Sequence, residues 1–361
     1  MKVLFISHTF DHGVFKVGSH HLTREMSRLG MEVAHVTTPF SIAHFLFSRS
    51  EVERRRLALC GVRIDADGVK HLIPRTVLPA QYSSDAYLHQ ALRDVDMERP
   101  DYLFLDQPLM LSADLLSRAT IAVYRPTDLY LHGMAWHLQT KYVQRFTAVA
   151  ATSHEVLSSL TPTLNQPRTV IPNGVEYSRF AAPGLPAVRN GVVYVGAFDS
   201  RFDWTTVIHM ARSLPAIPFS LVGPGALPPG NLPANMRVIG AMKYEDVPQY
   251  LRRFAVGLLP LSSDPQNAGR SPMKLFEYLA SGLHVVATGL SGLIGRTDLP
   301  GVLFYSNPDD AVGALTDALA IGGSNAAGIE SARAQDWSVK AKQLLSFANS
   351  ARCARHHAAH T

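Results

Sequence analysis

The sequence predicts an α/β protein made of two doubly wound domains, each built around a parallel sheet. Short apolar runs alternate with helical patterns along the chain, which is typical of strand–helix–strand units. The alternation occurs in two series, and a proline-rich run at residues 181–187 separates them. A chain of 361 residues is long enough for two such domains.

The first series opens with a strand at Lys2–Ile6, a loop, a helix from about residue 19 to residue 29, and a strand at Val33–Thr37. The loop contains no G-x-G-x-x-G fingerprint, which counts against a dinucleotide-dependent oxidoreductase. We expect the later elements of this series to be a hairpin of residues 62–64 and 71–73, strands at 102–105, 121–124 and 147–151, and helices at 113–118 and from residue 153.

The second series repeats the same alternation. We expect strands at residues 192–195, 219–222, 238–239, 255–260, 285–287 and 302–305, and helices at 203–213, 271–282, 308–321 and 336–345.

Composition excludes several classes of protein. The net charge of +5 is spread over both halves, so no basic block indicates a nucleic-acid partner, although an anionic membrane surface remains compatible with it. The two cysteines form no disulfide framework or zinc motif, which favours the cytoplasm. We expect no signal peptide and no transmembrane helix, and hence a cytoplasmic protein, soluble or peripheral on the inner face of the cell membrane.

The segment at residues 39–58 has two interpretations. Its apolar side chains precede the basic run at residues 54–56 and include Phe40, Ile42, Phe45, Leu46 and Phe47. They could form an interfacial membrane anchor. The alternative is a core-facing helix with a solvated basic end.

The helix that begins near Ser271 and Pro272 has the properties of an anion site. Its first turn offers unpaired N–H groups and a partial positive charge, and Lys274 adds a full charge. Glu277 can accept hydrogen bonds from the two hydroxyls of a ribose. The alternative is an exposed Lys274–Glu277 pair of little energetic value.

This segment closely resembles the donor-nucleotide motif of GT-B glycosyltransferases, through Pro272, Lys274, Leu275, Glu277, Tyr278, Ala280 and Gly282. The resemblance implies a GT-B fold, with two Rossmann-like domains facing across a cleft and a C-terminal helix crossing back to the first. We therefore expect an acceptor domain at residues 1–178, completed by residues 336–361, and a donor domain at residues 179–335.

A carboxylate that follows a strand is the candidate base. Asp128 comes after the strand at residues 121–124, where it could take a proton from an acceptor hydroxyl. The alternative from the residues alone is an N-cap for a helix starting near Leu129.

A second resemblance is carried by the start Ser7-His8, by the segment Tyr-Arg-x-x-Asp128, and by Ser271-x-Met273-Lys274-Leu. Through these segments, and over nearly its whole length, the chain is similar to the xanthan-pathway glucuronosyltransferase family, which is inverting and acts on a lipid-linked oligosaccharide. This similarity implies that Asp128 is the catalytic base, and that Ser271, Met273 and Lys274 bind the donor nucleotide. Glu277, where that family is expected to carry glutamine, instead resembles the retaining GT4 family. That family's glutamate is absent at Gly269, however, as is its Arg/Lys pair after Gly196.

Further candidates lie in loops after strands. Gly196 and Gly223 would let the backbone approach the nucleotide, although a plain turn explains Gly223 equally well. The remaining candidates for donor-sugar or acceptor contacts are His8, His20, Arg201, Asp264 and Gln266. The histidines near the first loop are more often packing residues than metal ligands, so we expect no metal site.

The sequence thus predicts an inverting, metal-independent glycosyltransferase without a cofactor. Its expected substrates are a UDP-sugar, with glucuronic acid as the expected sugar, and a glycan or lipid-linked acceptor in exopolysaccharide or cell-envelope biosynthesis. Three alternatives remain: a retaining GT4-type hexosyltransferase, a sugar-nucleotide epimerase and a non-catalytic nucleotide-sugar binding protein.

Overall fold

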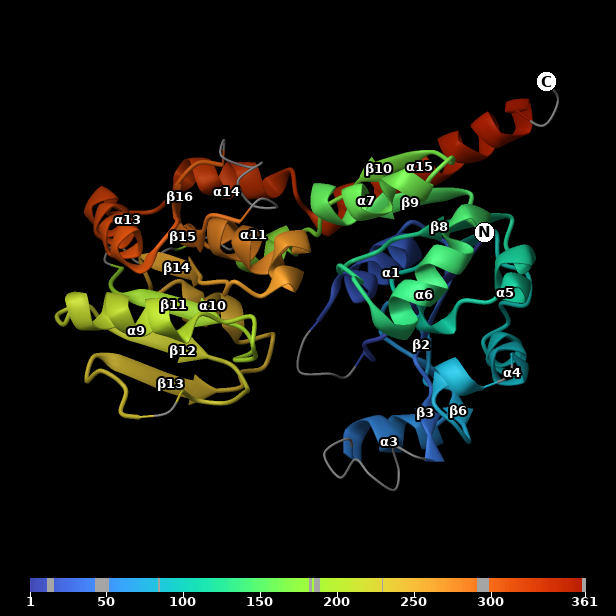
Figure 1. Ribbon diagram of the computed structural model, residues 1–361, viewed down its shortest axis with the longest axis horizontal. Helices are drawn as coiled ribbons and strands as arrows, with labels where there is room; N and C mark the ends of the chain where they lie inside the picture. Colours follow the sequence, from blue (N-terminus) through green and yellow to red (C-terminus); the bar gives the residue numbers. More distant parts are fainter. Residues whose placement is uncertain are drawn as a thin grey trace. The chain divides into compact units, whose positions relative to one another are not determined.

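The computed structural model describes residues 1–11, 16–42, 52–83, 85–181, 184, 189–228, 230–290 and 299–358. The chain forms two compact units (Figure 1). Unit 1 comprises Met1–Pro172 and Lys340–Thr361, and unit 2 comprises Asn173–Val339. These limits lie a few residues from those expected from the sequence, and the proline-rich run falls mostly outside the described residues.

Unit 1 contains a largely parallel sheet. Among the described residues it has eight strands in the order β10-β9-β8-β7-β1-β2-β5-β4, of which β4 alone runs antiparallel to its neighbour. Their bounds are β1 Lys2–Ser7, β2 Glu32–Thr37, β4 Arg63–Ile64, β5 Lys70–Leu72, β7 Tyr102–Leu105, β8 Ile121–Tyr124, β9 Ala148–Ala151 and β10 Arg168–Val170. The order reverses between β1 and β7, and ligands of such sheets bind at the carboxyl ends beside this reversal.

Helices cover both faces of this sheet because its side chains alternate between two apolar cores. The α-helices of unit 1 are α1 Gly18–Arg28, α3 Val52–Leu59, α4 Ala86–Asp94, α5 Ala113–Arg118, α6 Gly133–Tyr142, α7 His154–Leu160 and α15 Trp337–Ala358, whose first residues belong to unit 2. Short 3-10 helices occupy Ala80–Tyr82, Pro108–Met110, Val143–Arg145 and Thr161–Thr163.

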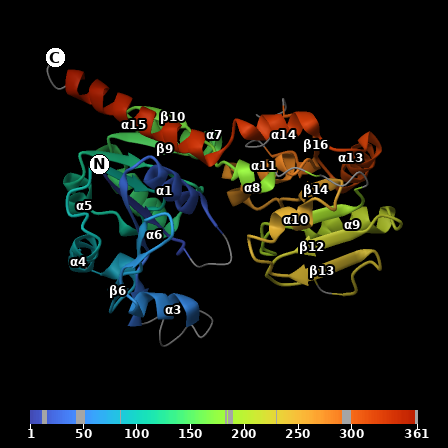
Figure 2. The ribbon, with the colours of Figure 1, turned by 180° about the vertical axis from the view of Figure 1, so that it is seen from behind.

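One face packs against α4, α5 and α7, with Leu4 and Leu103 of the sheet in the same core. On the other face the rings of Phe5 and Phe104 stack with centroids 4.9 Å apart. There the hydroxyl of Tyr102 donates a hydrogen bond to Asn349 of α15 at 2.7 Å. Figure 2 shows α15 as the long red helix in front of this sheet. The C-terminal segment therefore returns to unit 1, as predicted.

Unit 2 has a fully parallel sheet. Its six strands, among the described residues, lie in the order β13-β12-β11-β14-β15-β16, which reverses between β11 and β14. Their bounds are β11 Val192–Val195, β12 Phe219–Val222, β13 Met236–Gly240, β14 Val256–Leu259, β15 His284–Thr288 and β16 Val302–Tyr305. All six strands expected for the second series are present.

The helices of unit 2 also cover both faces of the sheet. They are α8 Tyr177–Phe180, α9 Trp204–Ser213, α10 Val247–Leu251, α11 Met273–Ala280, α13 Pro308–Ile321 and α14 Ala326–Arg333, with a 3-10 turn at Pro265–Gly269. Alternate residues of β15 separate the two cores: Val285 and Ala287 pack with α10 and α11, and Val286 packs with α9 and α13. This confirms a doubly wound domain.

None of the helices in the part of the chain that the structure describes combines the length and apolarity needed to span a bilayer.

Candidate active site

Three neighbouring strands of unit 1 carry polar residues directly after their carboxyl ends. His8 follows β1, Asp106 follows β7, and Arg125 and Asp128 follow β8. The groups interact: Arg125, His8 and Asp128 all contribute electrostatically to the titration of Asp106. The structure thus brings the predicted Asp128 and His8 together with Asp106 and Arg125, which the sequence analysis did not single out.

Asp106 and Arg125 form a buried ion pair. Nη1 of Arg125 lies 3.3 Å from Oδ2 of Asp106, and their side chains are 1% and 5% exposed, respectively. Burial raises the pKa of Asp106, against the opposing effect of the Arg125 charge. Among the described residues, Oδ1 of Asp106 has no hydrogen-bond partner. The end of β7 therefore holds a carboxylate whose charge depends on its neighbours.

Asp128 is half-buried and does not cap a helix. The nearest helix, α6, begins at Gly133 with His132 as its N-cap residue, so the predicted start near Leu129 is wrong. Oδ2 of Asp128 accepts a hydrogen bond from the Thr127 hydroxyl at 2.8 Å. Because Asp128 does not cap α6, its carboxylate could still accept a proton from a substrate.

The two candidate histidines differ in environment. His8 is exposed beside Asp106. In His20, Nδ1 accepts from the backbone N–H of Val17 at 3.2 Å, and Nε2 donates to the carbonyl of Thr9 at 3.0 Å. Burial lowers the pKa of His20 to about 3. Since both of its ring nitrogens already bind backbone, the structure favours an internal, ordering role for His20.

In unit 2, two glycines meet where β11 and β12 end. A Cβ built on Gly223, whose φ is +154°, would lie 1.6 Å from the carbonyl oxygen of Gly196. The N–H of Gly196 in turn donates to the carbonyl of Val222 at 2.9 Å. Because no side chain fits at Gly223, the turn presents bare backbone next to the reversal of strand order.

The loop between β14 and α11 holds Ser271 by hydrogen bonds. Oγ of Ser271 accepts from the backbone N–H of Asn173 at 3.0 Å, and its carbonyl accepts from Nδ2 of Asn173 at 2.9 Å. Pro272 is the N-cap residue and Met273 the first residue of α11, one position later than predicted. Ser271 therefore fixes the entry to the helix through these two hydrogen bonds with Asn173.

Lys274 and Glu277 form an ion pair in the first turns of α11. The Nζ–Oε2 distance is 2.6 Å, and the side chains are 20% and 2% exposed, respectively. The exposed pair considered as the alternative is therefore not what forms, because the carboxylate is almost completely covered. Burial removes water from the Glu277 carboxylate, which costs free energy that a pair on the surface does not lose.

The remaining predicted residues surround the same edge of unit 2. Arg201 pairs with Asp199 in the loop after β11, and Asp264 accepts from the Ser200 hydroxyl at 3.1 Å. Gln266 is exposed, and its N–H donates to Oδ1 of Asp264 at 2.9 Å. Sequence reasoning missed Arg270, whose charge acts on Asp199 and lowers that residue's pKa together with Arg201.

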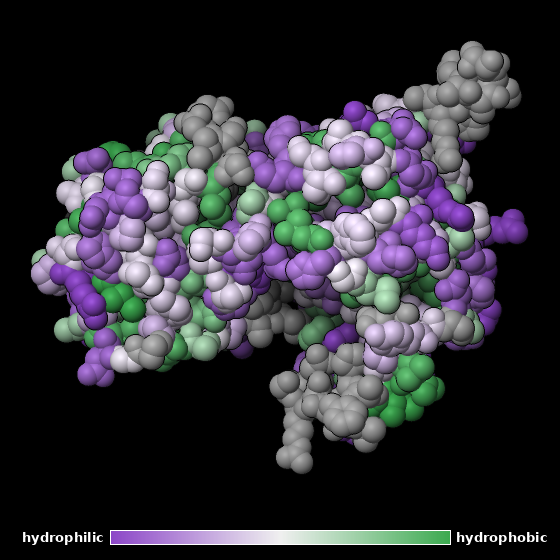
Figure 3. Space-filling view, viewed as in Figure 1, coloured by the Kyte–Doolittle hydropathy of each residue, from purple (hydrophilic) through white to green (hydrophobic). Residues whose placement is uncertain are grey.

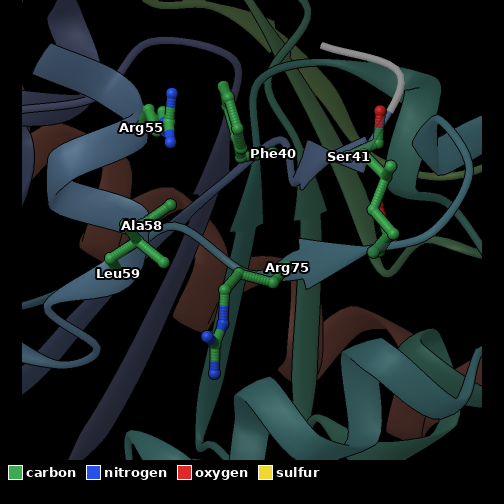
Figure 4. A pocket seen from close by; sticks show the side chains of 8 residues that line it. Phe40, Ser41, Arg55, Ala58, Leu59 and Arg75 are labelled. Atoms are coloured by element: carbon green, nitrogen blue, oxygen red, sulfur yellow. The ribbon is translucent and has the colours of Figure 1, made fainter. Parts of the chain in front are cut away.

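A small pocket lies apart from these groups in unit 1. It has a volume of about 320 Å³ and is formed by α3 and the two-stranded sheet of β3 (Phe40–Ser41) and β6 (Arg75–Thr76) (Figure 4). Its lining contains two arginines, Arg55 and Arg75. The other lining residues are Phe40, Ser41, Ile42, Ala58, Leu59 and Thr76. Figure 3 shows apolar surface over β3 and β6.

This pocket corrects part of the anchor hypothesis. Phe40 is 7% exposed and packs with Leu57, Ala58 and Ile73, so it belongs to a core. Ile42 is 53% exposed. Phe45, Leu46 and Phe47 lie outside the described residues.

Within the described ranges, no group of three or more His, Cys, Asp or Glu side chains is arranged to hold a metal ion.

Comparison of the sequence with known families matches residues 189–320 to the model described as "Glycosyl transferases group 1". A curated relative, named for teichuronic acid biosynthesis as the glycosyltransferase TuaH of Bacillus subtilis, is 28% identical. The alignment covers 58% of each of the two chains, so this chain spans little more than half the length of that relative.

Solved structures match almost the whole chain. Sucrose-phosphate synthase from Thermosynechococcus elongatus has a TM-score of 0.74 at 16% identity, covering 98% of this chain and 99% of that one. Alr3699/HepE of Anabaena, in complex with UDP-glucose, has a TM-score of 0.69 at 15% identity, covering 97% and 100%. These similarities show that the two Rossmann-like units have the GT-B fold.

Proposed function

We propose that this GT-B glycosyltransferase transfers a sugar from a UDP-sugar to a glycan or lipid-linked acceptor, with inversion and without a metal ion. The observation that carries the proposal is the edge of unit 2 at which bare glycine backbone, the start of α11 and the Lys274–Glu277 pair occur together. Backbone N–H groups and a lysine suit a diphosphate, and a carboxylate suits a ribose.

In the proposed donor site, Gly196 and Gly223 leave room for the nucleotide. Ser271, Met273 and the first N–H groups of α11 face the diphosphate, and Lys274 supplies its countercharge. Glu277 accepts hydrogen bonds from the ribose hydroxyls. As the bond between the anomeric carbon and the diphosphate breaks, negative charge grows on the departing oxygen, and Lys274 with the helix terminus stabilises it.

Asp128 is the proposed general base. Its carboxylate takes the proton of an acceptor hydroxyl while that oxygen bonds to the anomeric carbon and UDP leaves. The partial burial of Asp128 and its freedom from a capping role support this assignment. His8 lies close enough to Asp106 to influence its pKa, and we assign it an acceptor or donor-sugar contact.

The proposed acceptor belongs to polysaccharide assembly. TuaH is named for teichuronic acid biosynthesis, which supports a role in polysaccharide assembly and is compatible with glucuronate as the transferred sugar. The pocket lined by Arg55 and Arg75 beside the exposed Ile42 supports contact with an anionic membrane surface. Arg75→Ala should weaken co-sedimentation with anionic liposomes at low salt, and equal sedimentation would remove the membrane from the proposal.

The rival is a retaining transfer, which Glu277 favours through its resemblance to the GT4 family. Another structural relative, a trehalose-6-phosphate synthase at 11% identity, is described in terms of glycosyltransfer with retention. The anomeric configuration of the product, read by NMR from a donor of known configuration, separates the two outcomes.

The donor is tested first, by thermal shift with UDP-, GDP- and dTDP-sugars. A ligand present at 100 times its Kd stabilises the native protein by about 2.7 kcal/mol, which is readily detected. Stabilisation by UDP-sugars alone supports the proposal. Stabilisation without transfer to any acceptor in a membrane extract would instead indicate a binding protein, and turnover of the donor without an acceptor would indicate an epimerase.

A further inference from the structure

We infer that Leu131, Met134 and Trp136 form the surface on which a sugar ring of the acceptor lies, and that this part of the acceptor is a neutral glycan. These three residues are called the Trp136 surface. The inference rests on the proposed function, because it names the chemistry of the acceptor whose hydroxyl Asp128 would deprotonate. It involves none of the residues assigned to the donor.

The Trp136 surface follows the candidate base directly in the chain. β8 ends at Tyr124, Asp128 lies in the loop after it, and Leu131 comes three positions later. α6 begins at Gly133, so Trp136 lies close to its start. The Cα–Cβ bonds of a helix tilt toward its N-terminal end, which for α6 is the end joined to the Asp128 loop. The surface is therefore continuous with the part of unit 1 that carries the candidate base.

α6 buries very little of its own surface. Of its ten residues, all of which the structure describes, only Gln139 is buried, and its Oε1 accepts a hydrogen bond from the Tyr124 hydroxyl of β8 at 2.7 Å. Figure 1 shows α6 in the foreground of unit 1. Leu131, Met134 and Trp136 are 52%, 40% and 46% exposed, respectively. A surface helix normally turns its large apolar side chains toward the core, so apolar side chains gathered on the outside indicate a binding surface.

The absence of charge from this segment restricts the partner. Residues 129–140 contain no Asp, Glu, Lys or Arg, although the solvent face of a surface helix normally carries charged residues. Without a lysine or an arginine, the segment offers no lasting countercharge to a phosphate or to an anionic lipid headgroup. The Trp136 surface therefore fits a partner that is uncharged where the two touch.

A pyranose ring has the required properties. One face of the ring presents C–H groups that pack on an indole, and the hydroxyls at its edge remain free for hydrogen bonds. The exposed side chains of His132 and His137 lie on either side of Trp136 in the sequence, and their ring nitrogens can make such bonds. Gly133 lies one helical turn before Trp136, and a Cβ built there would have nothing within 4 Å. The position beside the indole is therefore open to a sugar.

Binding is measured by the fluorescence of Trp136 in the full-length protein without donor. Of the three tryptophans, Trp337 is 1% exposed and Trp204 packs against Phe198 and Phe202, so acrylamide should quench Trp136 most strongly. The probes are the neutral tetrasaccharides cellotetraose, maltotetraose and N-acetylchitotetraose, and vesicles of phosphatidylglycerol. We expect at least one tetrasaccharide to protect the fluorescence from acrylamide, and we expect this protection to be absent in Trp136→Phe.

Transfer from UDP-glucuronic acid to the protecting tetrasaccharide tests the role of the surface in the reaction. Trp136→Ala should raise the acceptor KM about tenfold, with kcat at saturating acceptor and the donor Kd unchanged. Trp136→Phe keeps an aromatic ring and should restore most of the affinity. A general folding defect would also lower the Tm and weaken donor binding. Ile321→Ala, which truncates an exposed apolar side chain of α13 in unit 2, is the control.

The outcomes separate the surface from the proposed function. If no tetrasaccharide protects Trp136, or if only the vesicles do, the glycan surface is wrong; this measurement uses the wild-type protein and does not depend on the folding of a variant. Transfer with an unchanged acceptor KM in Trp136→Ala would also overturn the surface, while the transferase stands. Protection by a tetrasaccharide without any transfer from bound donor would keep the glycan surface and reject the proposed reaction with that acceptor.

Discussion

Ser271 accepts a hydrogen bond from the backbone N–H of Asn173 at 3.0 Å, across 98 positions of the sequence. Nδ2 of Asn173 donates to the Ser271 carbonyl as well, so two bonds fix the approach to α11. The turn of residues 172–175 therefore holds in place the helix start to which the donor nucleotide is assigned.

Ser271→Ala should lower the free energy of unfolding by about 1 kcal/mol, because one intramolecular hydrogen bond is lost. We also expect weaker donor binding, since the helix start loses its support. Urea unfolding and donor titration measure the two effects. Ser350→Ala is the control: it removes a solvent-exposed hydrogen bond to the carbonyl of Ser346 in α15, at 3.0 Å, and should change stability by less than ~0.5 kcal/mol because water replaces that partner. Equal behaviour of the two variants would contradict the role of Ser271.

Glu277→Ala should raise the donor KM strongly, with a loss of about 1.5–3 kcal/mol in donor binding, because hydrogen bonds to a charged group are lost. Calorimetric titration with UDP measures this directly. The matched control is Glu330→Ala, which breaks another i,i+3 pair, with Arg333 at 3.1 Å, in which both side chains are exposed. Unchanged affinity in Glu277→Ala would remove the ribose contact from the proposal.

Asp128→Asn should reduce kcat by roughly 10²- to 10⁴-fold, the usual contribution of a general base, with donor affinity preserved. Single-turnover transfer and equilibrium donor binding separate the two quantities. Asp317→Asn, a change at an exposed carboxylate of α13, is the control. Turnover that survives in Asp128→Asn would eliminate this residue as the base.

Gly223→Ala should destabilise unit 2 severely, because the new Cβ would lie 1.6 Å from the carbonyl oxygen of Gly196. Relief requires the ends of β11 and β12 to separate, so we expect donor binding to be lost as well. Gly313→Ala is the matched control: that glycine lies exposed in α13 with nothing within 4 Å of a new Cβ. There alanine should stabilise the helix by up to about 1 kcal/mol. A stable Gly223→Ala variant would contradict the close packing.

Stability should fall with acidification below about pH 6.5, in part because of His20. Burial lowers its folded-state pKa from 6.5 to about 3, so between these values the unfolded chain binds a proton that the folded chain does not. The free energy of unfolding therefore rises with pH across this window, by at most about 1.4 kcal/mol per pH unit from this one group, and the contribution is complete above it.

His20→Gln should be less stable at pH 7 but show a shallower dependence of its unfolding free energy between pH 4 and pH 6. Denaturant unfolding at a series of pH values provides the measurement. A slope identical to that of the wild type would mean that His20 is protonated in the native protein.

Much of the fold followed from local patterns. The strand of residues 2–6 and the helix of residues 308–321 were predictable because apolar spacing and end signals agree there. The role of Asp128 was not settled in this way. An aspartate before Leu129 resembles an N-cap, yet α6 begins only at Gly133, with His132 as its N-cap residue. A local capping signal is a weak guide, because tertiary context routinely overrides it.

The sequence by itself determined the doubly wound class of both units and the placement of most strands and helices, since each depends on short-range periodicity. The tertiary structure alone decided which residues share a site. Asp106 and Arg125, 19 positions apart, become a buried pair only because β7 and β8 are neighbours in the sheet. Likewise, only the tertiary structure shows that the Glu277 side chain is buried and that Phe40 packs in a small core. Burial and long-range contacts set the charges of these groups, and neither can be seen in the order of the residues.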